Sequence, residues 1–338
     1  MEPRILFTGQ HLEMLEGIAD PLDLDAYHRL TVMKKGQSLN ELSASLLTAL
    51  QGYFEKDRPD LVVVQGDTTS SFMGALAAYH QKIPVVHVEA GLRTGDNYAP
   101  FPEEVNRKGI AQIAELHFAP TRKAFDQLKS EGHTSVHLTG NTVVDAIQKM
   151  RQKMASESMN EDTKQILVTT HRREAEEQGL RSICKALKQI ATANNDVLIK
   201  LPMHLNPMVR KVIQEELSDA PRIDLVEPLS YPEMVKALER SWLLITDSGG
   251  LQEEAPAFNL PVLVLREKSE RMEAMEAGSA ILCGTNEKRI VTAFEKLYQD
   301  QNEYDKMASA PNPFGDGLAG IRITEIIAHH FSGLIDRT

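Results

Sequence analysis

The sequence predicts an α/β protein with two doubly wound domains that face each other across a cleft. Short apolar segments typical of buried parallel strands alternate with helix-length segments along most of the chain. A polar segment, residues 155–164, interrupts this alternation near the middle. The 338 residues are enough for two separate cores. We therefore expect an N-terminal domain over residues 1–154, a second domain over residues 155–317, and a last helix within residues 318–338 that packs back on the first domain.

Five apolar runs of strand length occur in the first half. They are RILFT, LVVVQ, PVVHV, LHFA and SVHLT. Helices are expected over residues 39–54 and 121–131, and over residues 70–81, which join LVVVQ to PVVHV. Because such crossovers are nearly always right-handed, these two strands point the same way and their carboxyl ends lie at one edge of the sheet.

Acidic residues follow the strands at that edge. Asp67 comes after LVVVQ, Glu89 comes after PVVHV, and Glu103 and Glu104 precede the next helical segment. An alternative for Asp67 is the N-cap of a helix, and the glutamate pair could simply open a helix after Pro102. Glu89 is harder to explain in this way, because an acid beside an apolar run is costly without a partner or a task. We expect these carboxylates to converge where open α/β sheets bind ligands.

The second half repeats the alternation with QILVT, VLIKL, IDLVE, WLLIT, PVLVL and AILC. WLLIT is followed by Asp247 and Ser248, which suit a helix cap, and by Gly249 and Gly250, which allow close backbone approach. Free N–H groups at a helix start form an anion site suited to a diphosphate, although a capped tight turn has the same pattern. Glu254, expected in the first turn of this helix, could accept hydrogen bonds from ribose hydroxyls or simply complement the helix dipole.

Cationic side chains follow a strand in the same half. His171, Arg172 and Arg173 come directly after QILVTT, and Arg271 lies in SERMEA. Arginine pairs with phosphate in a fork geometry and histidine can exchange a proton with a leaving group. The alternative for the H-R-R run is a solvated basic turn.

Composition excludes several classes of function. A net charge of −11 argues against a nucleic-acid or anionic-membrane surface. No apolar run approaches the roughly 20 residues that span a bilayer, and the first residues do not resemble a secretory signal. Cys184 and Cys283 lack metal-ligand spacing, so we expect reduced core thiols in a cytoplasmic protein. No cluster of residues has metal-ligand spacing, so we expect no metal. No G-x-G-x-x-G follows a first strand, so we expect no nicotinamide cofactor.

Several of these motifs together resemble the UDP-N-acetylglucosamine 2-epimerase family, particularly its non-hydrolysing branch. The segments that carry the resemblance are residues 66–104, GNTVVDA (140–146), VTTHRRE (168–174), MHLNP (203–207), TDSGGLQEEAP (246–256), SERMEAMEAG (269–278) and NPFGDG (312–317). They occur in the family's order. Members usually begin with a further strand and a G-T-R-P-E loop, whereas this sequence starts at what corresponds to the second strand. On that reading two cationic phosphate contacts are missing, which would weaken catalysis.

The resemblance implies a two-Rossmann, GT-B-like fold and the reversible conversion of UDP-N-acetylglucosamine to UDP-N-acetylmannosamine, without cofactor. UDP is eliminated across C1 and C2 to give a glycal and is then added back. It also implies a cytoplasmic homodimer that serves cell-envelope polysaccharide synthesis. The implied roles are catalytic for Asp67, Glu89, Glu103 and His171; UDP- or substrate-binding for Arg172, Ser248, Gly249, Gly250, Glu254 and Arg271; and allosteric for Gln10, His11, Arg93 and His204.

Three other functions remain open at this point. A hydrolysing 2-epimerase would release free N-acetylmannosamine and UDP. A glycosyltransferase can use a similar two-domain scaffold, although it should not need this combination of acids. A catalytically impaired homologue would bind UDP-sugars without turnover.

Overall fold

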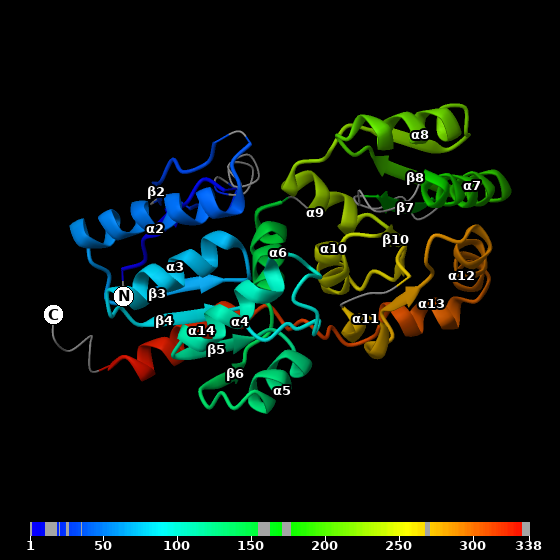
Figure 1. The fold of residues 1–338 in the computed structure, drawn as a ribbon. Coiled ribbons are helices and arrows are strands. Elements are labelled where there is room, and N and C mark those ends of the chain that lie inside the picture. Colours follow the sequence, from blue (N-terminus) through cyan, green and yellow to red (C-terminus); the bar gives the residue numbers. More distant parts are fainter. Residues whose placement is uncertain are drawn as a thin grey trace. The chain divides into compact units, whose positions relative to one another are not determined.

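The computed structural model describes residues 2–10, 19, 21–24, 27–34, 36–154, 163–170, 177–267 and 271–332. The chain divides into two compact units (Figure 1). One comprises Met1–Ala146 and Phe314–Thr338, and the other comprises Ile147–Pro313. The division falls inside helix α6 (Thr142–Lys153), shortly before the polar segment at residues 155–164. Most of that segment lies outside the described residues, and Lys164 already belongs to a strand.

The first unit contains a four-stranded parallel sheet in the order β3-β4-β5-β6. Its strands are β3 (Val62–Gln65), β4 (Val85–Val88), β5 (Leu116–Ala119) and β6 (Val136–Leu138). A separate parallel pair joins β1 (Ile5–Phe7) to β2 (Tyr27–Arg29). The apolar runs predict β1 and β3 to β6, whereas β2 has the sequence YHR and carries no apolar signal.

Helices cover both faces of the four-stranded sheet. They are α2 (Leu39–Lys56), α3 (Thr69–His80), α4 (Glu103–Ile113), α5 (Arg122–Ser130) and α14 (Ala319–His330). Side chains alternate along a strand, so successive residues of β4 face opposite sides. Val85 packs in a cluster with α2 and α3, whereas Val86 and Val88 pack with Ile323 and Ile327 of α14. The sheet is therefore buried on both faces, as a parallel sheet requires.

The motifs GNTVVDA and NPFGDG tie the C-terminal helix to the first unit. Asp145 accepts hydrogen bonds from the backbone N–H groups of Ala319 and Gly320, at 3.2 and 2.7 Å, and so caps the start of α14. A Cβ on Gly140 would lie 3.2 Å from the Cα of Gly315. The two loops therefore approach so closely that glycine is needed at both positions.

The second unit is built around a six-stranded parallel sheet in the order β12-β11-β10-β7-β8-β9. Its strands are β7 (Lys164–Thr169), β8 (Val197–Pro202), β9 (Ile223–Val226), β10 (Leu243–Thr246), β11 (Val262–Val264) and β12 (Ala280–Leu282). All six coincide with the predicted runs. The α/β fold class with doubly wound parallel sheets is thus confirmed, and β7 and β10 lie side by side in the middle of this sheet.

Each helix that the structure describes in the second unit has buried apolar residues. They are α7 (Glu177–Ala193), α8 (Pro207–Leu217), α9 (Tyr231–Glu239), α10 (Gly249–Glu254), the 3₁₀ helix η1 (Ala255–Phe258), α11 (Met272–Ala277), α12 (Glu287–Gln299) and α13 (Gln301–Ala308). Both cysteines are free thiols within this core. Among the helices that the structure describes, none has the length and apolar character needed to cross a membrane.

Candidate active site

The loop after β3 presents Asp67 at the carboxyl edge of the first sheet. Gly66 adopts a positive φ of 67°, which turns the chain sharply after the strand. The N-cap of α3 is the next residue, Thr68, whose hydroxyl accepts a hydrogen bond from the N–H of Ser71. The capping alternative for Asp67 is therefore wrong, and its carboxylate is available for another role.

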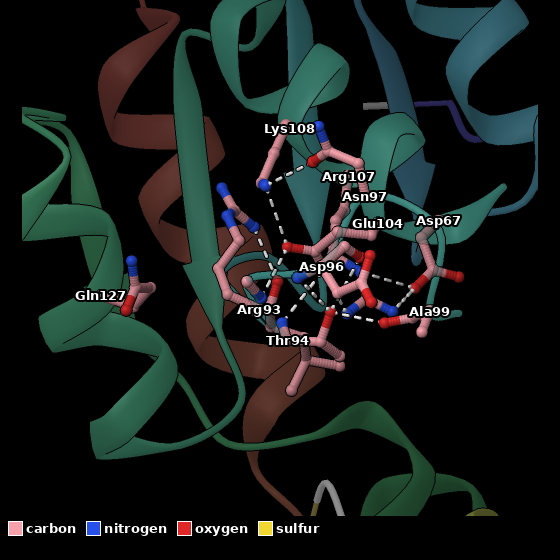
Figure 2. Close-up of polar contacts among 12 residues, drawn as sticks. Asp67, Arg93, Thr94, Asp96, Asn97, Ala99, Glu104, Arg107, Lys108 and Gln127 are labelled. Carbon is pink, nitrogen blue, oxygen red and sulfur yellow. Dashed lines mark hydrogen bonds and ion pairs between the residues drawn. The ribbon is translucent and has the colours of Figure 1, made fainter. Parts of the chain in front are cut away.

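Arg107, on α4, binds the Asp67 carboxylate (Figure 2). Its Nε and one terminal nitrogen donate to Oδ2 of Asp67 at 3.0 and 2.5 Å. Its other terminal nitrogen donates to Glu104 at 3.2 Å. The guanidinium side chain is only 7% exposed, so one nearly buried cation bridges two carboxylates from different elements. Asn106, the preceding residue, also donates to the backbone carbonyl of Asp67 at 2.8 Å.

Glu104 is fully buried and holds the loop that follows β4. Its carboxylate accepts hydrogen bonds from the N–H groups of Thr94 and Gly95, at 3.1 and 3.2 Å, and pairs with Lys108 at 3.1 Å. Burial alone would raise the pKa of this carboxyl group, but those hydrogen bonds and the nearby cations outweigh burial and hold the pKa below its usual range. Glu104 is thus an ionised anchor, whereas the sequence singles out its neighbour Glu103.

Glu103 is the first residue of α4 and is half-buried. Its carboxylate has no hydrogen-bond or ion-pair partner among the residues that the structure describes. The two adjacent acids of PFPEE therefore differ in kind. Glu104 is satisfied inside the protein, and Glu103 remains available to a ligand.

Glu89 directly follows β4 in a left-handed backbone conformation, with φ of 61°. This region is uncommon for residues other than glycine and often marks functional positions. Gln65, at the end of β3, lies with its amide nitrogen 3.5 Å from the Glu89 carboxylate and donates to the Thr142 hydroxyl at 3.2 Å. Asp67, Glu89 and Glu103 are thus carried by one loop cluster at the carboxyl ends of β3 and β4.

The HVEAGLR segment requires a glycine at position 91. It has a φ of 100°, and a Cβ there would lie 2.3 Å from the backbone oxygen of Ala124 on α5. No side chain fits without displacing that backbone. The segment after Glu89 is therefore pressed against α5.

The predicted allosteric residues have local partners. Gln10 accepts hydrogen bonds from the N–H and hydroxyl of Ser70, in the first turn of α3. Arg93 makes a two-point pair with Glu131, at 2.9 and 2.7 Å. His204, in the second unit, accepts from the N–H of Asn206 at 3.0 Å. His11 lies outside the described residues. Any ligand role of Arg93 would require exchange of its pair with Glu131.

In the second unit, Ser248 caps α10 by accepting a hydrogen bond from the N–H of Leu251. The next residue, Gly249, lies against Arg271, since a Cβ at that position would be 2.9 Å from Cζ of the guanidinium. Arg271 is oriented by Glu253, which accepts from its Nε at 2.8 Å. The N–H of Ser248 donates to the Thr246 hydroxyl at 2.9 Å, so the N–H groups of Gly249 and Gly250 and the Arg271 guanidinium are the donors that suit an anion here.

The helix that follows is shorter than the sequence suggests. α10 has six residues and ends at Glu254, after which the chain tightens into η1. Pro256 lacks the N–H that would continue the α-helical pattern. The macrodipole of so short a helix is small, so the Arg271 guanidinium is the stronger source of positive potential.

Glu254 lies at the end of α10, so its predicted place in the first turn is wrong. Its side chain nevertheless reaches back toward the start, because its Oε1 is 3.8 Å from the position of a Cβ on Gly250. Burial raises its pKa to about 7, with a further contribution from Glu253. Its Oε2 is buried, and none of the described residues forms a hydrogen bond to it. Such an oxygen fits a ligand hydroxyl that would supply the missing hydrogen bond.

Two arginines of these sites, Arg266 and Arg107, are not among the residues predicted from the sequence. Arg266 donates from Nε to the carbonyl of Asp247 at 2.6 Å, which adds a second guanidinium to the DSGG turn. Arg107 could have been found from spacing, because Glu104, Arg107 and Lys108 stand at i, i+3 and i+4 of one helix.

His171 and Arg172 lie outside the described residues. Within the described part of the chain, no three metal-ligating side chains cluster as a metal site would need.

Similarity to known proteins is extensive. The sequence matches the UDP-N-acetylglucosamine 2-epimerase family over residues 1–328. It is 41% identical to the UDP-N-acetylglucosamine 2-epimerase of Escherichia coli K12, over 97% of this chain and 91% of that protein. The UDP-GlcNAc 2-epimerase of Neisseria meningitidis, solved bound to UDP-GlcNAc, superposes with a TM-score of 0.87 at 38% identity, over 96% of this chain and 91% of that chain. Staphylococcus aureus MnaA, solved with UDP, also gives 0.87, at 40% identity over 98% and 89% of the respective chains.

These relatives share the GT-B-like fold and most of their length with this chain. The family match covers residues 1–328 and so spans residues of both units. The chain belongs to the UDP-N-acetylglucosamine 2-epimerase family.

Proposed function

We propose that the protein is an isomerase that interconverts UDP-N-acetylglucosamine and UDP-N-acetylmannosamine by eliminating and re-adding UDP. The observation that carries this proposal is the set of carboxylates at the carboxyl ends of β3 and β4, in a chain of this family. Asp67 and Glu89 lie in loops that directly follow those strands, and Glu103 opens the helix after them. The relatives' names and ligands supply the substrate class.

The chemistry requires a base on one side and an anion site on the other. The C2–H bond of the sugar has no adjacent carbonyl, so a simple carbanion is inaccessible. When a base removes the C2 proton, the C1–O bond breaks, its electron pair leaves with UDP, and a C1=C2 double bond forms. UDP then re-adds to C1 while C2 accepts a proton on the opposite face. The products balance without cofactor or net consumption of water.

We assign the C2 proton transfer to Glu103 and Glu89, with Asp67 as a fixed negative charge. Glu103 has no partner among the described residues, whereas Asp67 receives two hydrogen bonds from Arg107. The Asp67 carboxylate is already engaged by that guanidinium, and a fixed negative charge can stabilise positive charge that develops on the sugar ring during C1–O cleavage. His171 remains our candidate for protonating or contacting the leaving diphosphate.

The UDP moiety is assigned to the second unit. The N–H groups of Gly249 and Gly250, the Ser248 hydroxyl and the Arg271 guanidinium would hold the diphosphate, with Arg172 as a further cation. Glu254 would accept hydrogen bonds from the ribose through its buried Oε2, which no described residue contacts by a hydrogen bond. These donors stabilise charge that grows on the diphosphate as the C1–O bond breaks, so they serve catalysis as well as binding.

Assembly, regulation and location rest on the family resemblance. We propose a cytoplasmic homodimer that UDP-N-acetylglucosamine also regulates, with Gln10, His11 and Arg93 of the first unit and His204 of the second as the candidate regulatory residues. Burial raises the pKa of the Cys184 thiol to about 12 and that of Cys283 to about 11, which agrees with inert, reduced cysteines.

Turnover in deuterium oxide tests the reaction itself. Proton NMR should show UDP-N-acetylmannosamine appearing from UDP-N-acetylglucosamine, with deuterium at C2 of both sugars. Glu103→Gln should slow deuterium entry by roughly 100-fold, the usual contribution of a general base. The exposed Glu115→Gln on the same unit should leave the rate unchanged. Epimer without deuterium would exclude proton transfer at C2, and free N-acetylmannosamine would indicate a hydrolysing enzyme.

A double-mutant cycle tests the diphosphate site. Gly249→Ala should weaken UDP binding in calorimetry by roughly tenfold, the scale of a lost charge-assisted hydrogen bond, because the new methyl group displaces the Arg271 guanidinium. In an Arg271→Ala background the same Gly249→Ala change should have little further effect. Additive losses from the two changes would show that Gly249 does not act through Arg271.

The ionisation of Glu254 should govern binding near neutral pH. Ribose hydroxyls donate to the ionised carboxylate, whose free-protein pKa is about 7, so affinity should increase as pH rises from 5.5 to about 7.5. UDP-N-acetylglucosamine is the suitable ligand because both its phosphates are esterified and do not titrate there. Calorimetry should show proton release on binding in the wild type and none in Glu254→Gln. Equal proton release in both proteins would exclude this role.

A further inference from the structure

A histidine is buried between the two strand ends that carry the carboxylates. His87 is the third residue of β4 and has no exposed surface. Its Nε2 lies 2.8 Å from the backbone oxygen of Gly66, in the loop after β3. By strand alternation it shares the sheet face of Val85, which packs against α2 and α3. None of the roles assigned above uses this side chain.

The protonation state of His87 follows from its partner. A carbonyl oxygen can only accept, so Nε2 must carry the proton of this hydrogen bond. The Nδ1 atom is buried and has no hydrogen-bond partner within the part of the chain that the structure describes. Burial lowers the pKa of the ring to about 4; the bond to Gly66 opposes this shift, and Arg93 and Arg107 add to it. The ring is therefore neutral at the pH where the enzyme works, as an Nε2–H tautomer.

The hydrogen bond links the two loops at a sensitive point. Gly66 immediately precedes Asp67, and His87 stands two residues before Glu89. A second bond, from the N–H of Gly66 to the carbonyl of Val88 at 3.0 Å, crosses the same gap. Glu89 itself adopts a left-handed conformation, which persists only when the surroundings enforce it. The two bonds together fix where one loop leaves the sheet relative to the other.

We propose that His87 is a positioning residue that sets the placement of Asp67 relative to Glu89 by donating its Nε2–H to Gly66. The inference rests on the proposed function, since it matters for turnover only if these carboxylates act on the sugar. It predicts a loss in kcat and little change in KM, because the diphosphate and ribose are assigned to the second unit.

His117 provides a matched control. It pairs with His87 in the register of β4 and β5, is 3% exposed, and also has a lowered pKa, caused first by burial. Its ring contact is with His133, at 4.7 Å between ring centroids, and it has no hydrogen bond to the Gly66 loop. If the loss of any buried histidine lowers kcat, substitutions at both positions should lower it. If the loss of positioning lowers kcat, only substitutions of His87 should do so.

Two amide substitutions show whether the side chain at position 87 must reach the Gly66 carbonyl or need only be polar. The side-chain nitrogen of His87→Gln can occupy the place of Nε2 and donate to Gly66, whereas that of His87→Asn falls short. We expect His87→Gln to keep kcat within about threefold of the wild type and His87→Asn to lose roughly 30- to 100-fold, the scale of a small misplacement of catalytic groups. His117→Gln and His117→Asn should both remain near the wild-type kcat. Equal kcat for the two His87 variants, or a change mainly in KM, would overturn the proposal.

A measurement on the unaltered protein is independent of turnover and of variant folding. Histidine labelled with ¹⁵N should show the His87 ring as the neutral Nε2–H tautomer from pH 6 to 8. A cationic ring or the Nδ1–H tautomer would overturn the proposal even if the variants fail to fold. If the wild type shows the expected tautomer but does not epimerise the sugar nucleotide, the proposed function fails while the His87–Gly66 contact stands.

Discussion

Arg107 is the cation on which the carboxylate site of the first unit depends. It lies almost buried on α4 and donates to Asp67 at the end of β3 and to Glu104 on its own helix. Glu104 in turn holds the N–H groups of Thr94 and Gly95, which belong to the loop after β4. Removing one member of such a buried network costs roughly 3–5 kcal/mol, because the remaining charges lose their compensation. The network therefore fixes two loops and one helix relative to each other.

The second unit presents a positive charge at a turn, whereas the first presents carboxylates at its strand ends. Arg271 is held by Glu253 and lies against Gly249, so its guanidinium takes a defined position beside the N–H groups of the DSGG turn. In both units an arginine joins the loop after a strand to an acidic residue on a helix. In the first unit Arg107 holds two carboxylates in place, and in the second unit the carboxylate of Glu253 holds Arg271 in place. Fixed charge of either sign costs no reorganisation when the substrate reacts.

Much of this organisation could be predicted from sequence because it follows from periodicity. Apolar runs located β3 to β12, and the acids after LVVVQ and PVVHV had to meet at one edge of a parallel sheet. β2 could not be predicted in this way, because its YHR sequence has no apolar signal. Glu254 does not lie in the first turn that the sequence predicts, because α10 begins at Gly249 and Glu254 is its sixth and last residue. Which of Glu103 and Glu104 faces inward cannot be predicted from the sequence either. That choice depends on partners such as Arg107 and Thr94, which only tertiary structure brings together.

Substitution of Arg107 by lysine tests whether this cation sets the geometry of the carboxylates. A lysine keeps the charge but cannot bind Asp67 and Glu104 together in fork geometry. Entry of solvent deuterium at C2 should fall by roughly 10- to 100-fold while the affinity for UDP stays within about twofold. Lys108→Met, which removes a contact to Glu104 but none to Asp67, should have a much smaller effect on the exchange rate. Unchanged exchange in Arg107→Lys, or a parallel loss of UDP affinity, would contradict the account.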